Sequence, residues 1–572
     1  MSFDLSRLEY YKLYGPTEGD QIALADTGLI IEIEKDFCAN SYGDECVSGG
    51  GKCARDGMGL TSGLTPEAGA LDVVLTNMII MDPIIGIVKG DLGIKDGKIV
   101  GIGKAGNPNT MDITPGLIVS AATEIISGGG GMIVTPGGVD CHIHFQDPEQ
   151  AWESLANGVT TMIGGGSGAK TLSVETTISG LKHMIESHEE IPVNVGFYGR
   201  GASCLPEVIE KAVHSGIIGI KLHEDWGCTP ETIRTCLNIA DKYGCQVQIH
   251  TDTLNEAGNL EDTLEAIGGR TIHAFHVEGA GGGHSPDVLE LCSYKNVIPS
   301  STNPTNPYTI NTVAEHLDMI ITVHHLNRNL KEDIEFAESR IRASTIAAED
   351  VLHDMGAISI ISSDSQGMGR AGETVLNTWQ LASKMKQQRG PLPGEINGND
   401  NQRVLRYLAK HTINPAIVLG IDDYVGSFKP GSLADIVIWK KEFFGAKPEF
   451  ILKQGFMVMS AVGDANASTK ASEPMIYRKQ FGAYGGAINS LCRVFVMKEA
   501  LEDGLEEKIP TSRGKFLPIK NTRNLSKNDM VRNNLCPVVK VDKKTYEVEI
   551  DGKKVSCPPA EVLSLAQKYY FR

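Results

Sequence analysis

The chain has 572 residues, of which 41% are hydrophobic and 22% charged, and it carries a formal net charge of −18 at pH 7. This length predicts about two to four structural units, and the composition is typical of a soluble globular protein. The negative charge argues against nucleic acid or an anionic membrane as a partner. No run of about 18 apolar residues occurs, so no membrane-spanning helix is predicted.

The start of the chain, MSFDLSRLEYYKLYGPTEGD, lacks the positive segment and the apolar run of a secretory signal. The 12 cysteines include no C-x-x-C pair, which fits reduced, mostly buried thiols. Both observations predict a cytoplasmic protein.

Two β-rich stretches lie far apart in the chain. Residues 71–104 alternate β-branched runs with turns, which predicts short antiparallel strands with KDGK, residues 95–98, as a hairpin turn. Residues 425–439 have the same character. We therefore expect residues 1–130 and 425–480 to form one composite β-sandwich domain.

Between these stretches, apolar runs alternate with mostly helical segments, which is the pattern of a parallel βα array. The eight runs cover residues 132–144, 159–166, 192–199, 217–223, 245–250, 270–276, 297–302 and 357–364. An array of this size predicts an α/β fold with a (β/α)8 TIM barrel over residues 131–424. The surplus residues 303–356 are expected at the mouth of the barrel as a lid. Residues 481–572 are expected to dock on the barrel or on partner subunits.

Polar residues follow the predicted barrel strands, and the chemistry of such barrels takes place at the carboxyl ends of the strands. These residues are His142, His144, Lys221, His223, His250, His276 and Asp364. His142 and His144 are two positions apart, so both imidazoles point to one face of a strand. A single histidine at a strand end is more often structural, and a lone H-x-H pair is ambiguous. Four strands that converge together with an aspartate favour a metal site.

Lys221 ends a buried apolar run, an unusual place for a lysine. Its ammonium has three donors and no acceptor, so it cannot bind a cation. Near metal ions the pKa of the amine should fall, and the neutral amine could react with carbon dioxide. The resulting carbamate has two oxygens and can bridge two cations. The alternative is an ion pair with Glu224 or Asp225, which explains Lys221 alone but not the other candidate ligands.

Several motifs together resemble the catalytic (large) subunit of urease, in the amidohydrolase superfamily. The motifs are TPGGVDCHIHF (135–145), GIKLHEDWG (219–227), HTDTLNEAG (250–258), FHVEGAGGGHSPD (275–287), HHL (324–326) and SSDSQGMGR (362–370). The likeness begins at YGPTEGD, residues 14–20, and reaches the last residues, so it covers essentially the whole chain.

The resemblance implies two metal ions per chain, a residue that bridges them, and residues that hold urea. One ion would be held by His142, His144 and Asp364. The other ion would be held by His250 and His276. Lys221, as N6-carboxylysine, would bridge the two ions. His223 would donate to the carbonyl oxygen of urea, and the carbonyls of Gly281 and Gly367 would accept from its amides.

The implied reaction is hydrolysis of urea to ammonia and carbamate, which decomposes to bicarbonate and a second ammonia. A hydroxide held between the metals would attack while one metal polarises the urea carbonyl. His324 on the lid would be the general acid, oriented by Asp225 and Arg340. Nickel is the family expectation for the metal. Iron is kept as an alternative, since imidazole and carboxylate suit several first-row ions.

Two positions depart from the urease pattern. Val323 stands where cysteine is common, and Gly367 stands where alanine is usual. Without a thiol at residue 323, we predict only weak inactivation by thiol reagents acting at the lid. Gly367 can still offer its carbonyl, from a looser backbone. Neither change removes a ligand or an acid–base group, so both indicate an unusual subgroup that is still active.

Two alternatives remain. A cyclic-amide hydrolase of the dihydroorotase or hydantoinase type shares the barrel, the H-x-H pair, the bridging lysine and the aspartate. It does not share HEDWG (223–227) or GAGGGH (279–284). A non-catalytic amidohydrolase-like scaffold predicts missing ligands, and none is missing.

The resemblance also implies partners for this chain. These are one or two separate small urease subunits, further large subunits in a homotrimer or a larger assembly, and accessory proteins (metallochaperones) for metal loading and lysine carbamylation.

Overall fold

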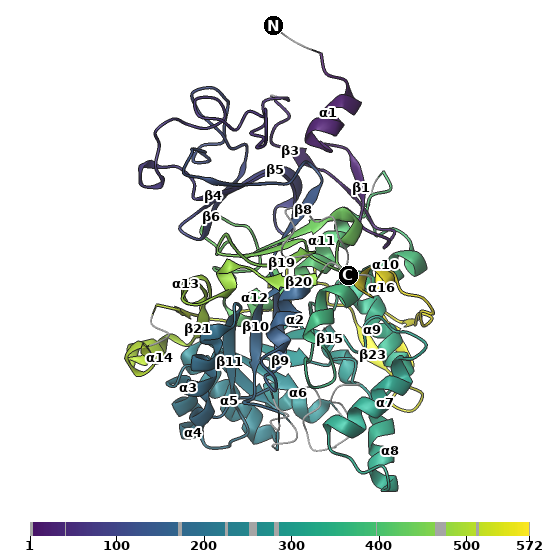
Figure 1. Ribbon diagram of the computed structural model, residues 1–572. Coiled ribbons are helices and arrows are strands. Elements are labelled where there is room, and N and C mark those ends of the chain that lie inside the picture. The colour runs from purple at the N-terminus through teal and green to yellow at the C-terminus, as the bar shows by residue number, and fades with distance from the viewer. Residues whose placement is uncertain are drawn as a thin grey trace.

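The computed structural model describes residues 4–40, 42–169, 174–223, 227–250, 260–279, 285–395, 397–463, 476–510 and 514–570. These residues form two large sheets and two small ones, with helices around them (Figure 1). One large sheet is the barrel, in the lower half of the view, and the other, here called the flank sheet, is in the upper half. No helix among these residues is long and apolar enough to cross a membrane.

Parallel strands follow one another around the barrel in the order of the sequence. They are β9 (Gly138–His144), β10 (Val159–Gly165), β11 (Asn194–Arg200), β12 (Gly219–Leu222), β13 (Gln246–His250), β14 (Ile272–Phe275), β15 (Val297–Thr302) and β16 (Ile360–Ser362). A parallel bridge between Ile143 and Ser365 joins the two ends of this series. The predicted TIM barrel is therefore confirmed.

Helices connect the barrel strands and cover them. They are α2 (Gln150–Ala156), α3 (Ile178–Ser187), α4 (Pro206–Val213), α5 (Pro230–Tyr243), α6 (Glu261–Ile267) and α9 (Ala343–Met355). The sequence of α5 explains its limits. The Thr229 side chain caps the first turn by accepting from the backbone N–H of Thr232, and Gly244 takes the left-handed conformation that ends the helix. Ile233 and Leu237 point into the core from the same face.

The flank sheet combines strands from both sides of the barrel in the sequence. Its strands are β3 (Lys35–Asp36), β4 (Val73–Asp82), β5 (Gly86–Lys95), β6 (Lys98–Gly103), β7 (Glu124–Ser127), β8 (Met132–Pro136), β17 (Ile436–Lys440), β18 (Phe450–Lys453), β19 (Phe456–Val462) and β20 (Ile476–Lys479). β8 pairs with β4 on one side and with β17 on the other. The union of the two β-rich stretches in one sheet is confirmed, whereas the exact domain limits stay predictions.

The predicted hairpin at KDGK is confirmed. Asp96 and Gly97 have φ of 51° and 70°, the left-handed values that a tight two-residue turn requires. β4 and β5 are each 10 residues long, so the first flank strands are longer than the short strands that the turn signals indicated.

One predicted run proves to be two strands. Residues 132–144 were expected to be a single barrel strand, but β8 ends at Pro136 in the flank sheet and β9 begins at Gly138 in the barrel. The break falls at Gly137, where a Cβ atom would lie 2.1 Å from Thr160 Oγ1. Only glycine allows this close approach, and Pro136 has no N–H with which to continue a sheet.

The segment expected to be a lid, residues 303–356, is only partly separate from the barrel. α9 is buried over most of its length and packs in the barrel core, so it is an ordinary barrel helix. α7 (Thr312–Val323) and α8 (Lys331–Arg340) form a hairpin with its own small core, which includes Ile320, Ala337 and Met368. In Figure 1 this hairpin projects at the end of the barrel opposite the flank sheet.

The remaining helices and strands lie around the barrel and the flank sheet. They are α1 (Arg7–Tyr14), β1 (Gln21–Ala23), β2 (Ile30–Glu32), α10 (Thr374–Arg389), α11 (Asn401–Lys410), α12 (Ile413–Leu419), α13 (Ala487–Leu491), β21 (Val494–Val496), α14 (Lys498–Glu502), α15 (Leu505–Lys508), β22 (Phe516–Pro518), β23 (Val539–Val541), β24 (Val548–Ile550), β25 (Lys553–Val555) and α16 (Ala566–Tyr570). β21 pairs with β11, so the carboxyl-terminal part of the chain docks on the barrel.

Lys453 fastens the flank sheet to the barrel. Its ammonium is 0% exposed, pairs with the Asp435 carboxylate, and donates to the carbonyl oxygen of Thr160 on β10 at 3.2 Å. Asp435 also accepts from Asn194 Nδ2 on β11 at 2.7 Å. A buried charge without its partner is costly, so this network stabilises the contact between the two sheets.

We expect Lys453→Met to lower the free energy of unfolding by about 3–5 kcal/mol, because Asp435 is left buried without its cation. The midpoint of unfolding in guanidinium chloride measures this. Lys429→Met, which breaks the exposed 3.0 Å pair with Asp423, is the control and should cost less than about 1 kcal/mol. Similar midpoints for the two variants would contradict the role given to Lys453.

Candidate metal centre

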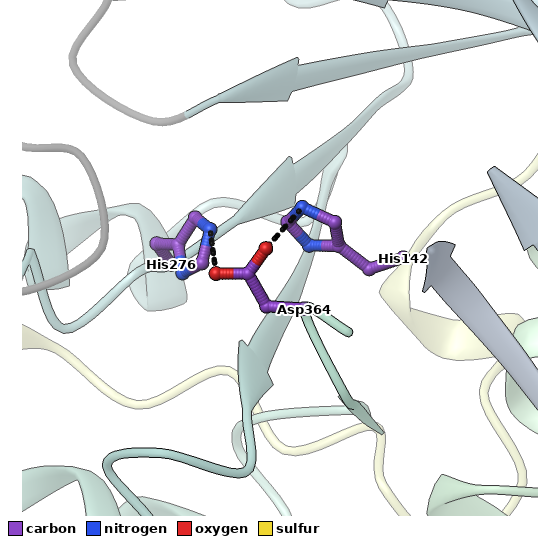
Figure 2. Close-up of side chains that lie close together, drawn as sticks. All are labelled: His142, His276 and Asp364. Carbon is purple, nitrogen blue, oxygen red and sulfur yellow. Dashed lines mark ion pairs between the residues drawn. The ribbon is translucent and has the colours of Figure 1, made fainter. Parts of the chain in front are cut away.

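His142, His276 and Asp364 meet at the carboxyl ends of three barrel strands. One ligand atom from each lies within 4.8 Å of the others. The Nε2 atoms of His142 and His276 are 3.3 and 3.7 Å from the carboxylate oxygens of Asp364 (Figure 2). Both His276 and Asp364 have positive φ, 49° and 56°, a strained backbone that is typical of functional sites.

His144 lies on the same face of β9 as His142. Its Nε2 atom is 2.9 Å from Asp364 Oδ1, and the two imidazole rings stack with their centroids 5.7 Å apart. The H-x-H pair and the aspartate are therefore together in space, as the two-residue spacing along a strand predicted.

Two further histidines and a lysine continue this cluster on β12 and β13. The His250 ring lies 4.7 Å from the His276 ring and 4.2 Å from the His223 ring, centroid to centroid. Lys221 is 0% exposed, and its Nζ atom lies 4.0 Å from the centroid of the Phe275 ring. All seven strand-end residues thus gather at one end of the barrel. Asp225 and Gly281 lie outside the described residues.

The charges of the cluster suit a cation. Burial, together with the charge of Lys221, lowers the pKa of His142 well below the usual histidine value. Burial also lowers the pKa of His276, although Asp364 opposes the shift. For Asp364, burial would raise the pKa, but the hydrogen bond with His144 and the charge of His276 outweigh it, so the pKa is lowered. Neutral imidazoles beside an ionised carboxylate are the donors that first-row divalent ions prefer.

The residues present fit such ions in a second respect. The Nδ1 atoms of His142 and His144 are buried, and neither has a hydrogen-bond partner among the described residues. With no hydrogen bond to a described residue at Nδ1 to fix the tautomer, each imidazole in its neutral form can carry its proton on Nδ1 and present Nε2, which faces Asp364, to a cation.

His324 and Arg340 lie together on the α7–α8 hairpin. Arg340 Nη1 is 3.3 Å from His324 Nε2, and Arg340 is 2% exposed. His324 is the residue that caps the carboxyl end of α7. The structure thus brings these two residues together, in the region where the lid was expected.

One histidine near the site was missed in the sequence. His316 on α7 is 1% exposed, its Nδ1 is 2.7 Å from the carbonyl oxygen of Thr312, and its Nε2 has no partner among the described residues. Burial lowers its pKa, while Asp364 is close enough to raise it in part. The only signal was a histidine within the segment expected to be a lid, and a lone histidine is more often structural.

Gly367 lies against the ligand cluster. A Cβ atom at this position would be 2.6 Å from Asp364 Oδ1 and 2.7 Å from His144 Nε2. Alanine would therefore push the carboxylate and the imidazole apart, whereas glycine permits their direct contact.

We predict that Gly367→Ala lowers the thermal stability of the metal-free protein by about 1–3 kcal/mol, the usual cost of inserting a methyl group into a packed site. Differential scanning calorimetry of the chelator-treated protein measures this. Gly131→Ala is the control, because nothing lies within 4 Å of a Cβ atom there. If both variants melt at the temperature of the parent, the packing around Gly367 is looser than described.

The sequence of the chain is similar to protein-family models and to curated proteins. The model of the urease alpha-subunit N-terminal domain matches residues 3–126, and that of the amidohydrolase family matches residues 133–471. Curated proteins named urease subunit alpha from Haloquadratum walsbyi and Natronomonas pharaonis are each 53% identical to the chain, and each alignment covers 100% of both proteins.

The chain also resembles solved structures at lower identity. An L-hydantoinase from Arthrobacter aurescens has a TM-score of 0.48 and 16% identity, and the match covers 68% of this chain and 96% of the hydantoinase. A likeness of this size gives no support to a cyclic-amide hydrolase.

Proposed function

This chain belongs to the urease alpha-subunit family, and we propose that it is the catalytic subunit of a urease. It hydrolyses urea to ammonia and carbamate, which decomposes to bicarbonate and a second ammonia. One observation carries the proposal: His142, His276 and Asp364 meet within 4.8 Å at the mouth of the barrel, in a chain that matches urease alpha subunits along its whole length.

The site would hold two divalent ions. His142, His144 and Asp364 are assigned to one ion, and His250 and His276 to the other. Lys221, on β12, would bridge them as the carbamate. Nickel is the proposed metal, with iron as the alternative. Bound cations of this kind polarise a carbonyl and provide a water-derived nucleophile near neutral pH.

The side chains of the protein would then orient urea and move a proton. His223 donates a hydrogen bond to the urea carbonyl oxygen, while the backbone carbonyls of Gly281 and Gly367 accept from the amides. These contacts hold the carbonyl carbon in one orientation, which lowers the entropy cost of the attack.

His324 would protonate the leaving nitrogen. The C–N bond of urea breaks slowly, because its amine is a poor leaving group until it is protonated. A general acid is therefore required. Arg340 would orient the ring, because its Nη1 atom lies 3.3 Å from Nε2 of His324. Asp225 is proposed to help orient the same ring.

Partners are proposed from the family. The relatives are named alpha subunits, which fits an assembly with separate small subunits and further large subunits, loaded by accessory metallochaperones. Exposed apolar side chains on and beside β19 and β20 support a covered surface, since Phe481 and Tyr484 are 84% and 58% exposed. The chain is proposed to act in the cytoplasm.

Ammonia release from urea by the assembled, metal-loaded enzyme tests the function. We expect His324→Asn to lower kcat by about 10²- to 10⁴-fold with little change in KM, because a general acid acts mainly in the transition state. His325→Asn is the control, because His325 is exposed, and asparagine tolerates its φ of 56°. A loaded parent that releases no ammonia from urea would refute the proposal, and cyclic amides would then be tested.

Thiol reagents test the departure at residue 323. No cysteine lies in residues 303–356, and of the 12 cysteines only Cys204 is exposed. We therefore expect a maleimide to leave most of the activity, whereas Val323→Cys should be inactivated in parallel with labelling. Val323→Ala is the control and should resist. Inactivation of the parent as fast as that of Val323→Cys, or full activity of labelled Val323→Cys, would contradict this account.

A further inference from the structure

The barrel seam between β9 and β16 carries the ligands of one proposed metal ion. His142 and His144 lie on β9, and Asp364 follows β16. Among the described residues, the two strands share only the bridge between Ile143 and Ser365, whereas the other neighbouring strands of the barrel are joined by hydrogen-bonded ladders. Other contacts must therefore hold this seam together.

The Gln366 side chain supplies such contacts. Its Oε1 atom accepts three hydrogen bonds, from the backbone N–H of Gln146 at 3.0 Å, that of Asp147 at 2.8 Å, and Gln150 Nε2 at 2.7 Å. Its backbone carbonyl accepts a fourth, from Gln146 Nε2 at 2.8 Å. One residue of the Asp364 loop is thus bound four times to the segment that follows His144.

Gln150 extends these contacts to the backbone of His144 and to the side chain of Ser365, the residue after Asp364. It is 7% exposed, and its Nε2 also donates to the carbonyl oxygen of His144 at 2.9 Å. Its Oε1 accepts from Ser365 Oγ at 2.8 Å. The backbone N–H of His144 in turn donates to the carbonyl oxygen of Ser365 at 3.0 Å. The residues next to the two ligands are therefore joined directly.

The backbone of the Asp364 loop needs this support. Asp364 and Gln366 both have positive φ, 56° and 63°. Aspartate is among the residues that adopt such values more often, but glutamine rarely does. Such a conformation persists only when surrounding contacts hold it. The acceptor of Gln366 joins three N–H groups of residues 146–150 to the Asp364 loop, so the strained loop is stabilised in one position.

We infer that Gln366 and Gln150 are positioning residues that fix the separation of His144 and Asp364. The inference rests on the proposed function, because it takes these two residues as ligands of one metal ion. Neither glutamine touches urea or the metal. Their task is to hold the carboxylate and the imidazole, now 2.9 Å apart, at a separation that a cation can enter without rearrangement of the loop.

Metal affinity tests the inference without any need for activity. Ni²⁺ alone is titrated by calorimetry into the chelator-treated chain in bicarbonate buffer. Gln366→Met keeps the length of the side chain but removes the acceptor, and we expect it to weaken Ni²⁺ binding by about 10- to 100-fold. Gln366→Glu keeps the acceptor and should restore binding to within about threefold of the parent.

A surface glutamine provides the matched control. Gln388 is exposed and makes one hydrogen bond, from its Nε2 to the carbonyl oxygen of Pro558 at 3.1 Å, so Gln388→Met should bind Ni²⁺ like the parent. If Gln366→Met fails to fold, Gln366→Asn replaces it. Asparagine tolerates the positive φ but is too short to reach the three N–H groups, so it should show the same loss.

The outcomes separate this inference from the proposed function. Parent affinity in Gln366→Met or Gln366→Asn, even with a lower melting temperature, overturns the positioning role and leaves urea hydrolysis untouched. Equal losses in the methionine and glutamate variants overturn it too, because the acceptor would not be the cause. A loaded parent that binds Ni²⁺ but releases no ammonia refutes the proposed function, while the affinities still decide the role of Gln366.

Discussion

Asp364 is a carboxylate with 3% of its surface exposed, and imidazole nitrogens of three histidines lie 2.9 to 3.7 Å from its two oxygens. Burying a carboxylate without compensation is costly, and here the ionised form is nevertheless favoured. The same burial lowers the pKa of His142 and that of His276 well below the usual histidine value, which favours their neutral forms. Asp364 thus places an ionised carboxylate beside imidazole nitrogens at the mouth of the barrel, and a divalent cation is the natural partner for this set of donors.

The barrel explains how residues 222 positions apart in the sequence, His142 and Asp364, come to share this place. Parallel strands in a closed barrel bring all their carboxyl ends to one rim. The α7–α8 hairpin is joined to the same rim. Met368 packs in the small core of the hairpin, and its backbone N–H donates to Asp364 Oδ2 at 3.3 Å. Movement of the hairpin would therefore shift the loop that holds the Asp364 carboxylate.

Much of the architecture and of the site could be predicted from the sequence. Each barrel strand appeared as an apolar run, because a strand buried on both faces shows no polar alternation. Polar residues at the ends of such runs stood out for the same reason, and this is how His250 and Asp364 were found.

Positions that depend on packing could not be read in this way. The break at Gly137 lies inside a continuous apolar run, and its cause is the approach of Thr160, which is distant in the sequence. Likewise, the sequence could not separate α9 from the expected lid. Its segment has mixed polarity, and this does not show which residues are buried against the barrel. Gln366 and Gln150 carry no local signal at all, since their partners lie about 220 residues away.

Anomalous X-ray diffraction from crystals of the metal-loaded assembly, recorded at the absorption edges of nickel and iron, tests the central claim most directly. We predict two peaks per chain, one in contact with His142, His144 and Asp364, the other with His250 and His276. Electron density for a carboxylate should extend from Lys221 Nζ to both peaks. A single peak, peaks away from these residues, or an unmodified Lys221 beside two bound ions would contradict the account.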